Sequence, residues 1–517
     1  MAEAVISGFG GRADWSATRA LSRTAAIVLA ALALSWAAVL NGQPFIHPDT
    51  IGYTRGPDVA VIKLFGPRFG TVWGKTNEKQ IDHPASAAAP GAKATASAGD
   101  NEVMGGRSIY YGVLAYLGAL TGGFWLTVFV QSLGVALLVE IALRGLRIMG
   151  VSTYAGVMAL LTLGTSAPFF AAFVMPDIWA GVAIGALAAL FALSRRLTRL
   201  DMAMLAAMTA FGALAHSSVV PVVGAMSLAG GGLWLINVRL GRGDAPDPRI
   251  GLGVGAAAIV IALAGGLAFS AMVKHTVGAP PLNPPFLTAR VIADGPGERY
   301  ALDNCAGQSF AVCKYAARLP MDVDHFLWGV TPKDGVFETV SSAERRALSD
   351  QDARFALAAA RAYPMQQAGA SARNAALQMV DTDLSDFNYK PSLRAGFAST
   401  VPAGPYAAMR TTLAFGEAWP LQALWGLQSA VVIASLVMLA GIGLRAQKVG
   451  SAHVEPSDAM IFALLILVGV LANGAVCGVL STLYGRYQAR VVWLIPLATT
   501  MLVLVRARAR GASVRLA

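Results

Sequence analysis

The sequence has few charged residues for its length. Only 13% of its 517 residues are Asp, Glu, Lys or Arg, whereas soluble domains carry about 25%. The hydrophobic residues make up 56% of the chain and occur in long uninterrupted runs, which the core of a soluble protein does not require. These two features exclude an ordinary soluble domain and indicate a membrane protein.

Several motifs of known chemistry are also missing. The chain contains no Gly-x-Ser-x-Gly, no glycine-rich phosphate loop ending in Lys and no His-Glu-x-x-His. The net charge is +11, but no basic run is interleaved with aromatic residues, so we expect no nucleic-acid partner. We find no internal repeat, which argues against the many secondary transporters that are built from two related halves.

Cysteine is scarce as well, with three residues in the chain. Cys305 and Cys313 lie close together in a polar region, and Cys477 lies inside a hydrophobic run. Two neighbouring cysteines are too few for a zinc site, which takes about four ligands. If their region faces an oxidising compartment, we expect Cys305 and Cys313 to form a small disulfide loop.

The hydrophobic runs predict an all-α polytopic membrane protein. A spanning helix needs about 20 mostly apolar residues, and we predict ten spans, with 110–140 counted as one re-entrant or surface helix followed by one span. The runs are 24–40, 110–119 with 121–140, 152–168, 178–194, 202–216, 219–237, 251–272, 420–442, 459–480 and 489–505. A cleaved signal peptide is the alternative for the first run.

Lys and Arg concentrate in alternate short loops, which predicts the orientation. Both termini are expected in the cytoplasm of a bacterium whose inner membrane holds the chain. The long segments 41–107 and 273–419 then face outward, and 273–419 is expected to be a mostly helical domain between membrane parts 1–272 and 420–517. A helical stretch is expected from Ser342 to Val380, and the Ala- and Ser-rich stretch 85–98 looks like an insertion.

Two aspartates are expected at the outer membrane face. Asp49 lies at the centre of the segment 41–53, directly after the first span, and Asp177 precedes the span 178–194. Each could be the N-cap of a helix. Alternatively, one carboxylate could act as a general base while the other binds a cation.

Other polar residues near the same face also have two interpretations. Arg107 could anchor at the lipid headgroups, as Tyr110 and Tyr111 would, or bind substrate. Arg486 and Arg490 occupy the one outside turn that breaks the charge rule, and arginine suits phosphate oxygens as well as headgroup anchoring. His216, between two spans, is either structural or part of a site.

In their order and sidedness these motifs resemble the GT-C superfamily of integral-membrane glycosyltransferases. The superfamily includes the protein mannosyltransferases and the enzymes that add aminoarabinose to lipid A. The resemblance covers roughly 24–240 and 420–505, whereas 273–419 matches nothing in it, and the insertion at 54–106 lengthens the first loop. It implies a GT-C fold, a polyprenyl-phosphate sugar donor and an inverting transfer to an envelope glycan, lipid or protein.

The resemblance also implies roles for single residues. Asp49 would be the catalytic carboxylate and Asp177 the second acidic residue; a divalent cation, Mg or Mn, could bind them, since some relatives use one. The remaining expected site residues are Arg107, Arg486 and Arg490 for the donor phosphate, and Tyr53, His216 and Tyr487 for the substrate.

Three other functions are alternatives. A transporter or flippase of a lipid-linked or anionic substrate would also use arginines, but most of the predicted spans lack the charges such a path needs. An acyltransferase or polymer ligase would depend on a histidine, with His47, His216 and His275 as candidates. A non-catalytic envelope assembly protein would use the segment 273–419 to bind a partner.

Overall fold

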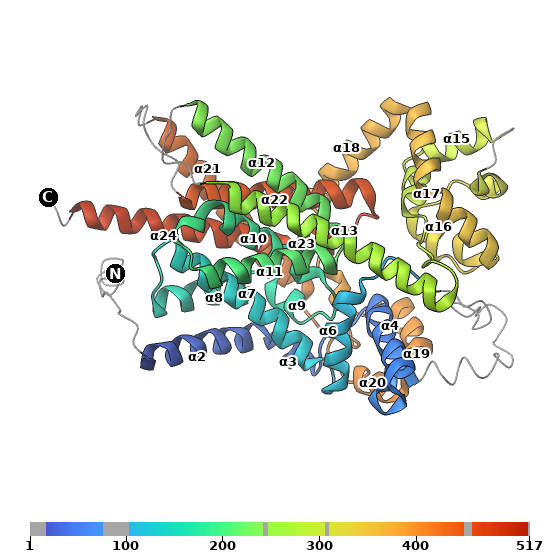
Figure 1. The fold of residues 1–517 in the computed structure, drawn as a ribbon, viewed down its shortest axis with the longest axis horizontal. Coiled ribbons are helices and arrows are strands. Elements are labelled where there is room, and N and C mark those ends of the chain that lie inside the picture. The colour runs from blue at the N-terminus through green and yellow to red at the C-terminus, as the bar shows by residue number, and fades with distance from the viewer. Residues whose placement is uncertain (1–16, 76–102, 241–246, 306–309, 449–457, 515–517) are drawn as a thin grey trace.

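The protein is helical throughout the part that the structure describes. The computed structural model describes residues 17–75, 103–240, 247–305, 310–448 and 458–514, so the predicted insertion 85–98 lies outside the described residues. Within these ranges two isolated β-bridges are the only extended pairings. The all-α prediction is therefore confirmed for the described residues (Figure 1).

Among the described residues, seven helices are long and apolar enough to cross a membrane, which shows a multi-pass membrane protein. These spans are Trp125–Gly145 (α7), Asp177–Arg196 (α10 with a short extension), Val219–Arg239 (α12), Arg249–Val277 (α13), Leu421–Leu444 (in α21), Asp458–Leu480 (α22) and Gly485–Ala509 (α23 and α24). The full helices at the C-terminal end are α21 (Leu421–Lys448), α23 (Gly485–Val492) and α24 (Leu494–Val514).

The other three predicted spans are not among these seven helices. The run 24–40 is divided into α2 (Ala17–Leu34) and α3 (Trp36–Asn41), and the run 152–168 ends as α8 (Val151–Gly164), before Pro168. The run 202–216 forms α11 (Arg199–Ala215), a helix of 17 residues. As expected, 110–140 contains two helices, the short α6 (Ile109–Leu120) and α7.

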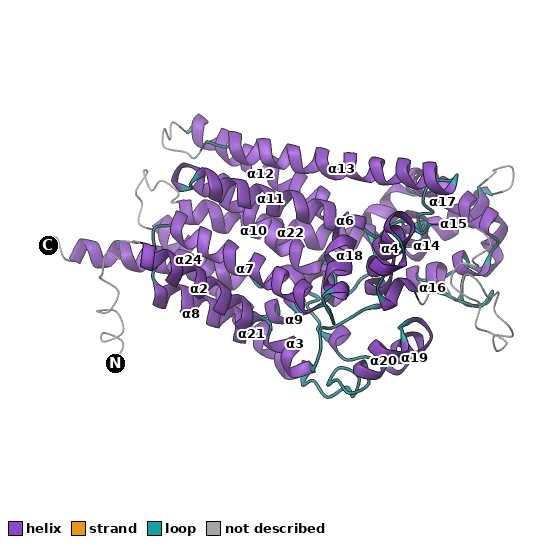
Figure 2. Cartoon of the chain, turned by 60° about the horizontal axis from the view of Figure 1, so that its bottom comes forward, coloured by secondary structure: helices purple, strands orange, loops and turns teal. Residues whose placement is uncertain are grey.

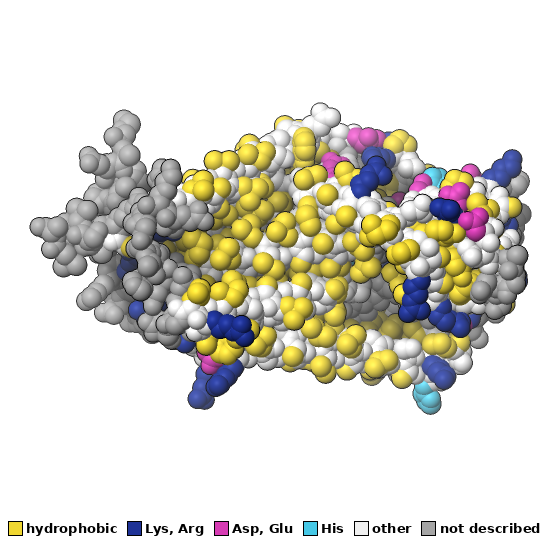
Figure 3. Space-filling view, turned by 90° about the horizontal axis from the view of Figure 1, so that it is seen from above, with side chains coloured by type: hydrophobic (Ala, Val, Ile, Leu, Met, Phe, Trp, Pro, Cys, Tyr) yellow, Lys and Arg dark blue, Asp and Glu magenta, His cyan; other side chains and the backbone are white. Residues whose placement is uncertain are grey.

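Burial separates central helices from lipid-facing ones. The whole spanning part of α10 is buried, whereas only 11% of that of α13 is. Figure 2 shows α12 and α13 along one edge of the bundle, and Figure 3 shows a broad hydrophobic surface between two ends that carry charged side chains. We infer that α10 is the centre of the membrane core and that α13 faces lipid.

One end of the bundle is held by ion pairs, and we call it the basic end. Arg23 of α2 and Arg144 of α7 both contact the fully buried Glu140, at 2.8 and 2.6 Å. Arg144 also pairs with Asp201 at the start of α11. The cations that predict the cytoplasmic face therefore gather at this end, while the direction of the membrane stays a prediction.

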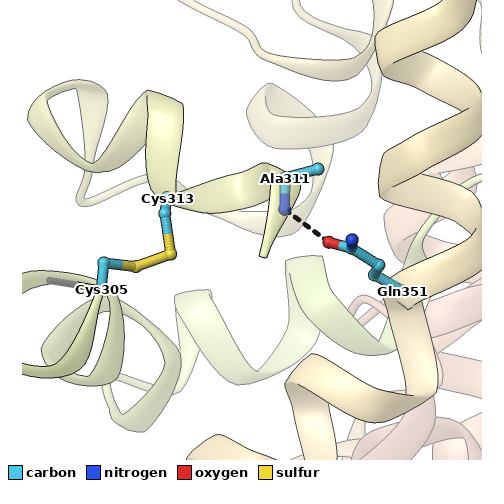
Figure 4. Close-up of a disulfide and its surroundings, with 4 residues drawn as sticks. All are labelled: Cys305, Ala311, Cys313 and Gln351. Atoms are coloured by element: carbon cyan, nitrogen blue, oxygen red, sulfur yellow. Dashed lines mark hydrogen bonds between the residues drawn. A yellow bond between two sulfur atoms is a disulfide. The ribbon is translucent and has the colours of Figure 1, made fainter. Parts of the chain in front are cut away.

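A second hydrophobic core lies beyond the opposite end, and we call it the cap unit. Its helices are α14 (Phe286–Ala293), α15 (Pro296–Asn304), η4 (Ala311–Arg318), α16 (Val323–Trp328), η5 (Phe337–Thr339) and α17 (Ser342–Ala362). A disulfide joins Cys305 to Cys313, and beside it the Ala311 amide donates to Gln351 of α17 (Figure 4).

The rest of 273–419 packs mainly on the membrane core, although Gln367 and Asn374 also donate to Asp294 at the end of α14. The helix expected from Ser342 to Val380 ends at Ala362, because Pro364 cannot continue it, and α18 (Pro364–Val380) starts anew. A Cβ on Gly478 of α22 would lie 2.6 Å from the Asn374 carbonyl oxygen of α18. Small residues thus allow the two helices to touch closely, as at many membrane helix contacts.

The segment after α18 belongs to the same core. It contains η6 (Ser385–Phe387), α19 (Pro391–Thr400) and α20 (Ala403–Met409). Phe387 is fully buried and packs against Phe45, with ring centroids 5.1 Å apart. The predicted domain 273–419 is thus split between two hydrophobic cores.

Candidate functional site

The segment that carries Asp49 is hydrogen-bonded to the segment before α10. The Phe45 amide donates to the Ala172 carbonyl, the Val174 amide donates to the Phe45 carbonyl, and the Thr50 hydroxyl donates to the Val174 carbonyl. These bonds hold the start of α4 (Pro48–Phe65) beside the chain that leads into Asp177. Two aspartates 128 positions apart in sequence are thereby brought to the same end of the bundle.

Neither aspartate is the N-cap of its helix. The cap of α4 is His47, whose amide donates to the Thr50 hydroxyl, and Asp49 lies in the first turn. Asp177 is the first residue of α10, after a cap at Pro176 that makes no side-chain bond. Both carboxylates thus lie near the positive end of a helix dipole. Because neither carboxylate caps its helix, both are available to other partners.

Arg107 forms an ion pair with Asp49. Its Nε lies 3.0 Å from Asp49 Oδ1, and Nη2 contacts the same oxygen. Both side chains are 28% exposed, so a substrate could reach them. The guanidinium group lies against Gly52, where a Cβ would be 2.7 Å from Arg107 Cδ, so glycine at position 52 leaves room for the arginine.

His47 connects Asp49 to a second arginine. Arg486 Nη1 lies 2.8 Å from His47 Nε2, and since arginine has no acceptor, the imidazole accepts this bond. The other ring nitrogen, Nδ1, lies 3.4 Å from the Asp49 backbone amide and 3.8 Å from Asp49 Oδ2. Arg486 Nε also lies 3.6 Å from Asp386 Oδ2 in η6.

Burial and neighbouring charges shift the pKa values of Asp49 and His47. Burial would raise the pKa of Asp49, but the charge of Arg107, with smaller effects of His47 and Arg486, lowers this pKa well below its ordinary value. Burial, followed by the charge of Arg486, lowers the pKa of His47 to about 4. At neutral pH the site therefore holds an ionised Asp49 and a neutral His47. We call Asp49, Arg107, His47, Arg486 and Asp386 the exposed group, after its partly exposed Asp49–Arg107 pair, although Arg486 itself is buried.

A second set of polar side chains surrounds Arg490, which is fully buried. Its guanidinium lies 3.4 Å from Asp177 Oδ1, 3.3 Å from His216 Nε2, 2.8 Å from the Ser218 hydroxyl and 3.0 Å from Asn473 Oδ1. Asp177 Oδ2 is buried without a hydrogen-bond partner. We call Asp177, His216, Ser218, Asn473 and Arg490 the buried group.

Aromatic residues adjoin both groups. The Tyr487 ring lies 5.2 Å from the guanidinium carbon of Arg486 and also 5.2 Å from that of Arg490, which suits cation–π attraction. Tyr53 packs edge-on against Tyr111, with ring centroids 5.1 Å apart. Burial raises the pKa of Tyr53 well above its ordinary value, so its hydroxyl is neutral and able to donate or accept hydrogen bonds.

The charges balance without any ligand. Three carboxylates, those of Asp49, Asp177 and Asp386, face three arginines. Within the described ranges, no group of three or more His, Cys, Asp or Glu side chains is arranged to hold a metal ion. Asp49 and Asp177 each pair with an arginine, so these residues do not fit the oxygen shell that Mg or Mn takes.

All the residues expected at the site lie in or beside the two groups, but several contributors had no role in the sequence interpretation. Asp386 and Asn473 come from segments with no recognisable motif. The bridging function of His47 depends on a partner 439 positions away. The closest signal in the sequence is the run His47-Pro48-Asp49, which places two ionisable groups around a rigid proline.

Comparison of the chain with protein-family models, with curated proteins and with solved structures finds no match. The function must therefore be argued from the chemistry of the two groups.

Proposed function

We propose that the protein is a GT-C-type glycosyltransferase that moves a sugar from a polyprenyl-phosphate donor to an acceptor hydroxyl of an envelope glycan, lipid or protein. The observation that carries the proposal is the exposed group. It combines a reachable carboxylate with two arginines at the end of a bundle whose sides face lipid. In this proposal the site lies at the outer face of a bacterial inner membrane.

The arginines suit the donor phosphate. A guanidinium group matches two phosphate oxygens at once, and Arg107 is partly exposed. Because the exposed and buried groups are neutral together, an arriving phosphate would compete with Asp49 for Arg107. Arg486 is 7% exposed, and its Nε, which makes no hydrogen bond, would donate to the phosphate while Nη1 keeps its bond to His47.

The same competition would prepare Asp49 for its role. While Arg107 is paired with Asp49, the low pKa makes the carboxylate a weak base. When Arg107 turns to the phosphate, the pKa of Asp49 rises and the carboxylate accepts a proton more readily. Donor binding would thus activate the base.

Transfer then requires one displacement. The acceptor oxygen forms a bond to the anomeric carbon, the bond from this carbon to the phosphate oxygen breaks, and the acceptor proton goes to Asp49. The polyprenyl phosphate leaves with the bonding electron pair, and the arginines stabilise its developing charge. Attack from the side opposite the phosphate inverts the anomeric centre.

Arg490 has a different role in this proposal from the clamp that its motif predicts. It is fully buried and already has five side-chain partners within 3.4 Å, the fifth being Cys477 Sγ. We assign it to holding Asp177 and the turn 484–490 in place. The direct phosphate contacts then fall to Arg107 and Arg486.

The test is deletion of the gene in its host, followed by mass spectrometry of envelope glycans. The deletion is complemented with wild type, with Asp49→Asn, or with Asp350→Asn, which makes the same charge change at an exposed site on α17. A sugar that is lost, restored by wild type and by Asp350→Asn, and not restored by Asp49→Asn supports the proposal. Full restoration by Asp49→Asn would overturn it in favour of a flippase or assembly protein.

A further inference from the structure

Both arginines of the exposed group follow segments that are bound to the cap unit or to its connection. The first segment precedes Arg107. The Gly105 amide donates to the Leu282 carbonyl at 2.7 Å, and the Leu282 amide donates to the Val103 carbonyl at 2.8 Å. Leu282 is fully buried in the core of the cap unit, so this core fixes the chain two residues before Arg107.

The second segment precedes Arg486 and is held more firmly. The Tyr484 hydroxyl donates to the Asp324 carboxylate on α16, and the Thr482 hydroxyl lies 3.4 Å from the other oxygen of this carboxylate. The backbone of Tyr484 makes two bonds to Gln378 of α18, at 3.1 and 2.8 Å. The Tyr484 ring lies 5.3 Å from the guanidinium carbon of Arg486.

We propose that Asp324 of the cap unit is a positioning residue for Arg486, acting through Tyr484. Asp324 fixes the Tyr484 hydroxyl, the fixed ring supports one side of the Arg486 guanidinium, and His47 receives the hydrogen bond of that guanidinium. The cap unit thus determines how Arg486 is presented to an anionic ligand. That this ligand is a lipid phosphate rests on the proposed function, whereas the coupling itself does not.

The physical basis is the flexibility of a long side chain. An arginine has several rotatable bonds, and the entropy lost when it binds a phosphate is smaller if it is already held in position. A hydrogen bond to a charged carboxylate is stronger than one between neutral groups. Loss of the Asp324 carboxylate should therefore free the ring and the arginine together.

The first measurement uses hydrogen–deuterium exchange of the full-length protein in detergent and needs no ligand. Asp324→Ala and Tyr484→Phe should each increase exchange in residues 482–490. The matched control is Asp322→Asn, which removes one negative charge two residues away while keeping a side chain able to cap α16. Unchanged exchange in both test variants would overturn the positioning role.

The second measurement is the affinity for an added polyprenyl monophosphate, followed by native mass spectrometry. Asp324→Ala and Tyr484→Phe should each weaken binding by roughly tenfold, and the double variant by no more than either one. In an Arg486→Lys background the two substitutions should have no further effect, whereas a general loss of structure would weaken binding there too and would overturn the proposal.

The outcomes separate the two proposals. If wild type does not bind the lipid phosphate but exchange rises as expected, the positioning role stands and the proposed donor is wrong. If wild type binds and transfers sugar while Asp324→Ala changes neither exchange nor affinity, the proposed function stands and the positioning role is wrong.

Discussion

The exposed and buried groups contain the same kinds of side chain in different surroundings. In each, an aspartate pairs with an arginine and a histidine contacts an arginine. The Asp49–Arg107 pair is 28% exposed, whereas Arg490 and Asp177 are at most 1% exposed. A partly exposed pair can exchange partners at low cost, while a buried charge left alone is expensive. A catalytic role therefore suits the exposed group, and a structural role suits the buried group.

We expect Asp49→Asn to show the largest difference between the groups, because it should reduce activity much more than stability. The amide cannot take the acceptor proton, so the rate of sugar transfer should fall by about three orders of magnitude. The free energy of unfolding should fall less than in a variant that breaks the Arg490–Asp177 pair, because the Asp49–Arg107 pair is partly exposed. Transfer is measured with the donor that the glycan comparison identifies. A variant that unfolds instead would make Asp49 a structural residue.

Substitutions in the buried group should lower the free energy of unfolding. Arg490→Ala leaves Asp177 buried without its counter-charge, and breaking such a pair costs about 3–5 kcal/mol. Thermal and denaturant unfolding in detergent measure this change. Adding Asp177→Asn should restore part of the loss, since the unpaired charge is gone. An equal loss from Arg486→Ala, whose partner Asp386 is 30% exposed, would remove the distinction between the groups.

His47 should make stability depend on acidity. Its pKa is about 4 in the folded protein and 6.5 ordinarily, so the unfolded chain binds the proton first as pH falls. The stabilisation is complete well above pH 6.5 and decreases toward pH 4, by about 1.6 kcal/mol between pH 6.5 and pH 5. Unfolding curves of wild type and His47→Gln over this range measure the effect.

The matched control for His47→Gln is His325→Gln. His325 lies on the cap unit, and its hydrogen bond to Asp322 raises its pKa, so its contribution has the opposite sign and is lost as pH rises. His47→Gln should reduce the loss of unfolding free energy between pH 6.5 and pH 5, and His325→Gln should not. A wild-type curve that is flat from pH 6.5 to pH 5 would contradict the neutral His47.

The smallest expected effect tests how Arg107 is seated. Gly52→Ala places a Cβ 2.7 Å from Arg107 Cδ, which is closer than the two atoms can approach. The arginine must therefore shift, and transfer should fall by roughly tenfold. Gly56→Ala is the control on the same helix, because its Cβ would meet only Ile109 at an ordinary 3.8 Å. Both changes favour the helix by up to about 1 kcal/mol. Equal activity of the two variants would argue against a role for the Arg107 position.

Hydropathy predicted the membrane class, but the number of spans it predicts is confirmed only in part. Seven of the ten runs form helices long enough to cross. The first run is divided near Ser35, and 152–168 stops before Pro168, where hydropathy alone registers no end. Proline also ended the helix expected from Ser342 to Val380, and that signal was visible in the sequence. The division of 273–419 between two cores depends on packing partners far along the chain, which a local pattern does not specify.

The sequence by itself determined that the chain is a polytopic helical membrane protein, because apolar runs of spanning length have few alternatives in water or in lipid. It also marked Asp49, Asp177, Arg486 and Arg490 as unusual for their positions. Only the tertiary structure decided how they pair: Asp49 with Arg107, Arg490 with Asp177, and Arg486 with His47 and Asp386. The physical reason is that exposure and charge balance arise from residues hundreds of positions apart, so local sequence fixes which groups are present but not which are buried together.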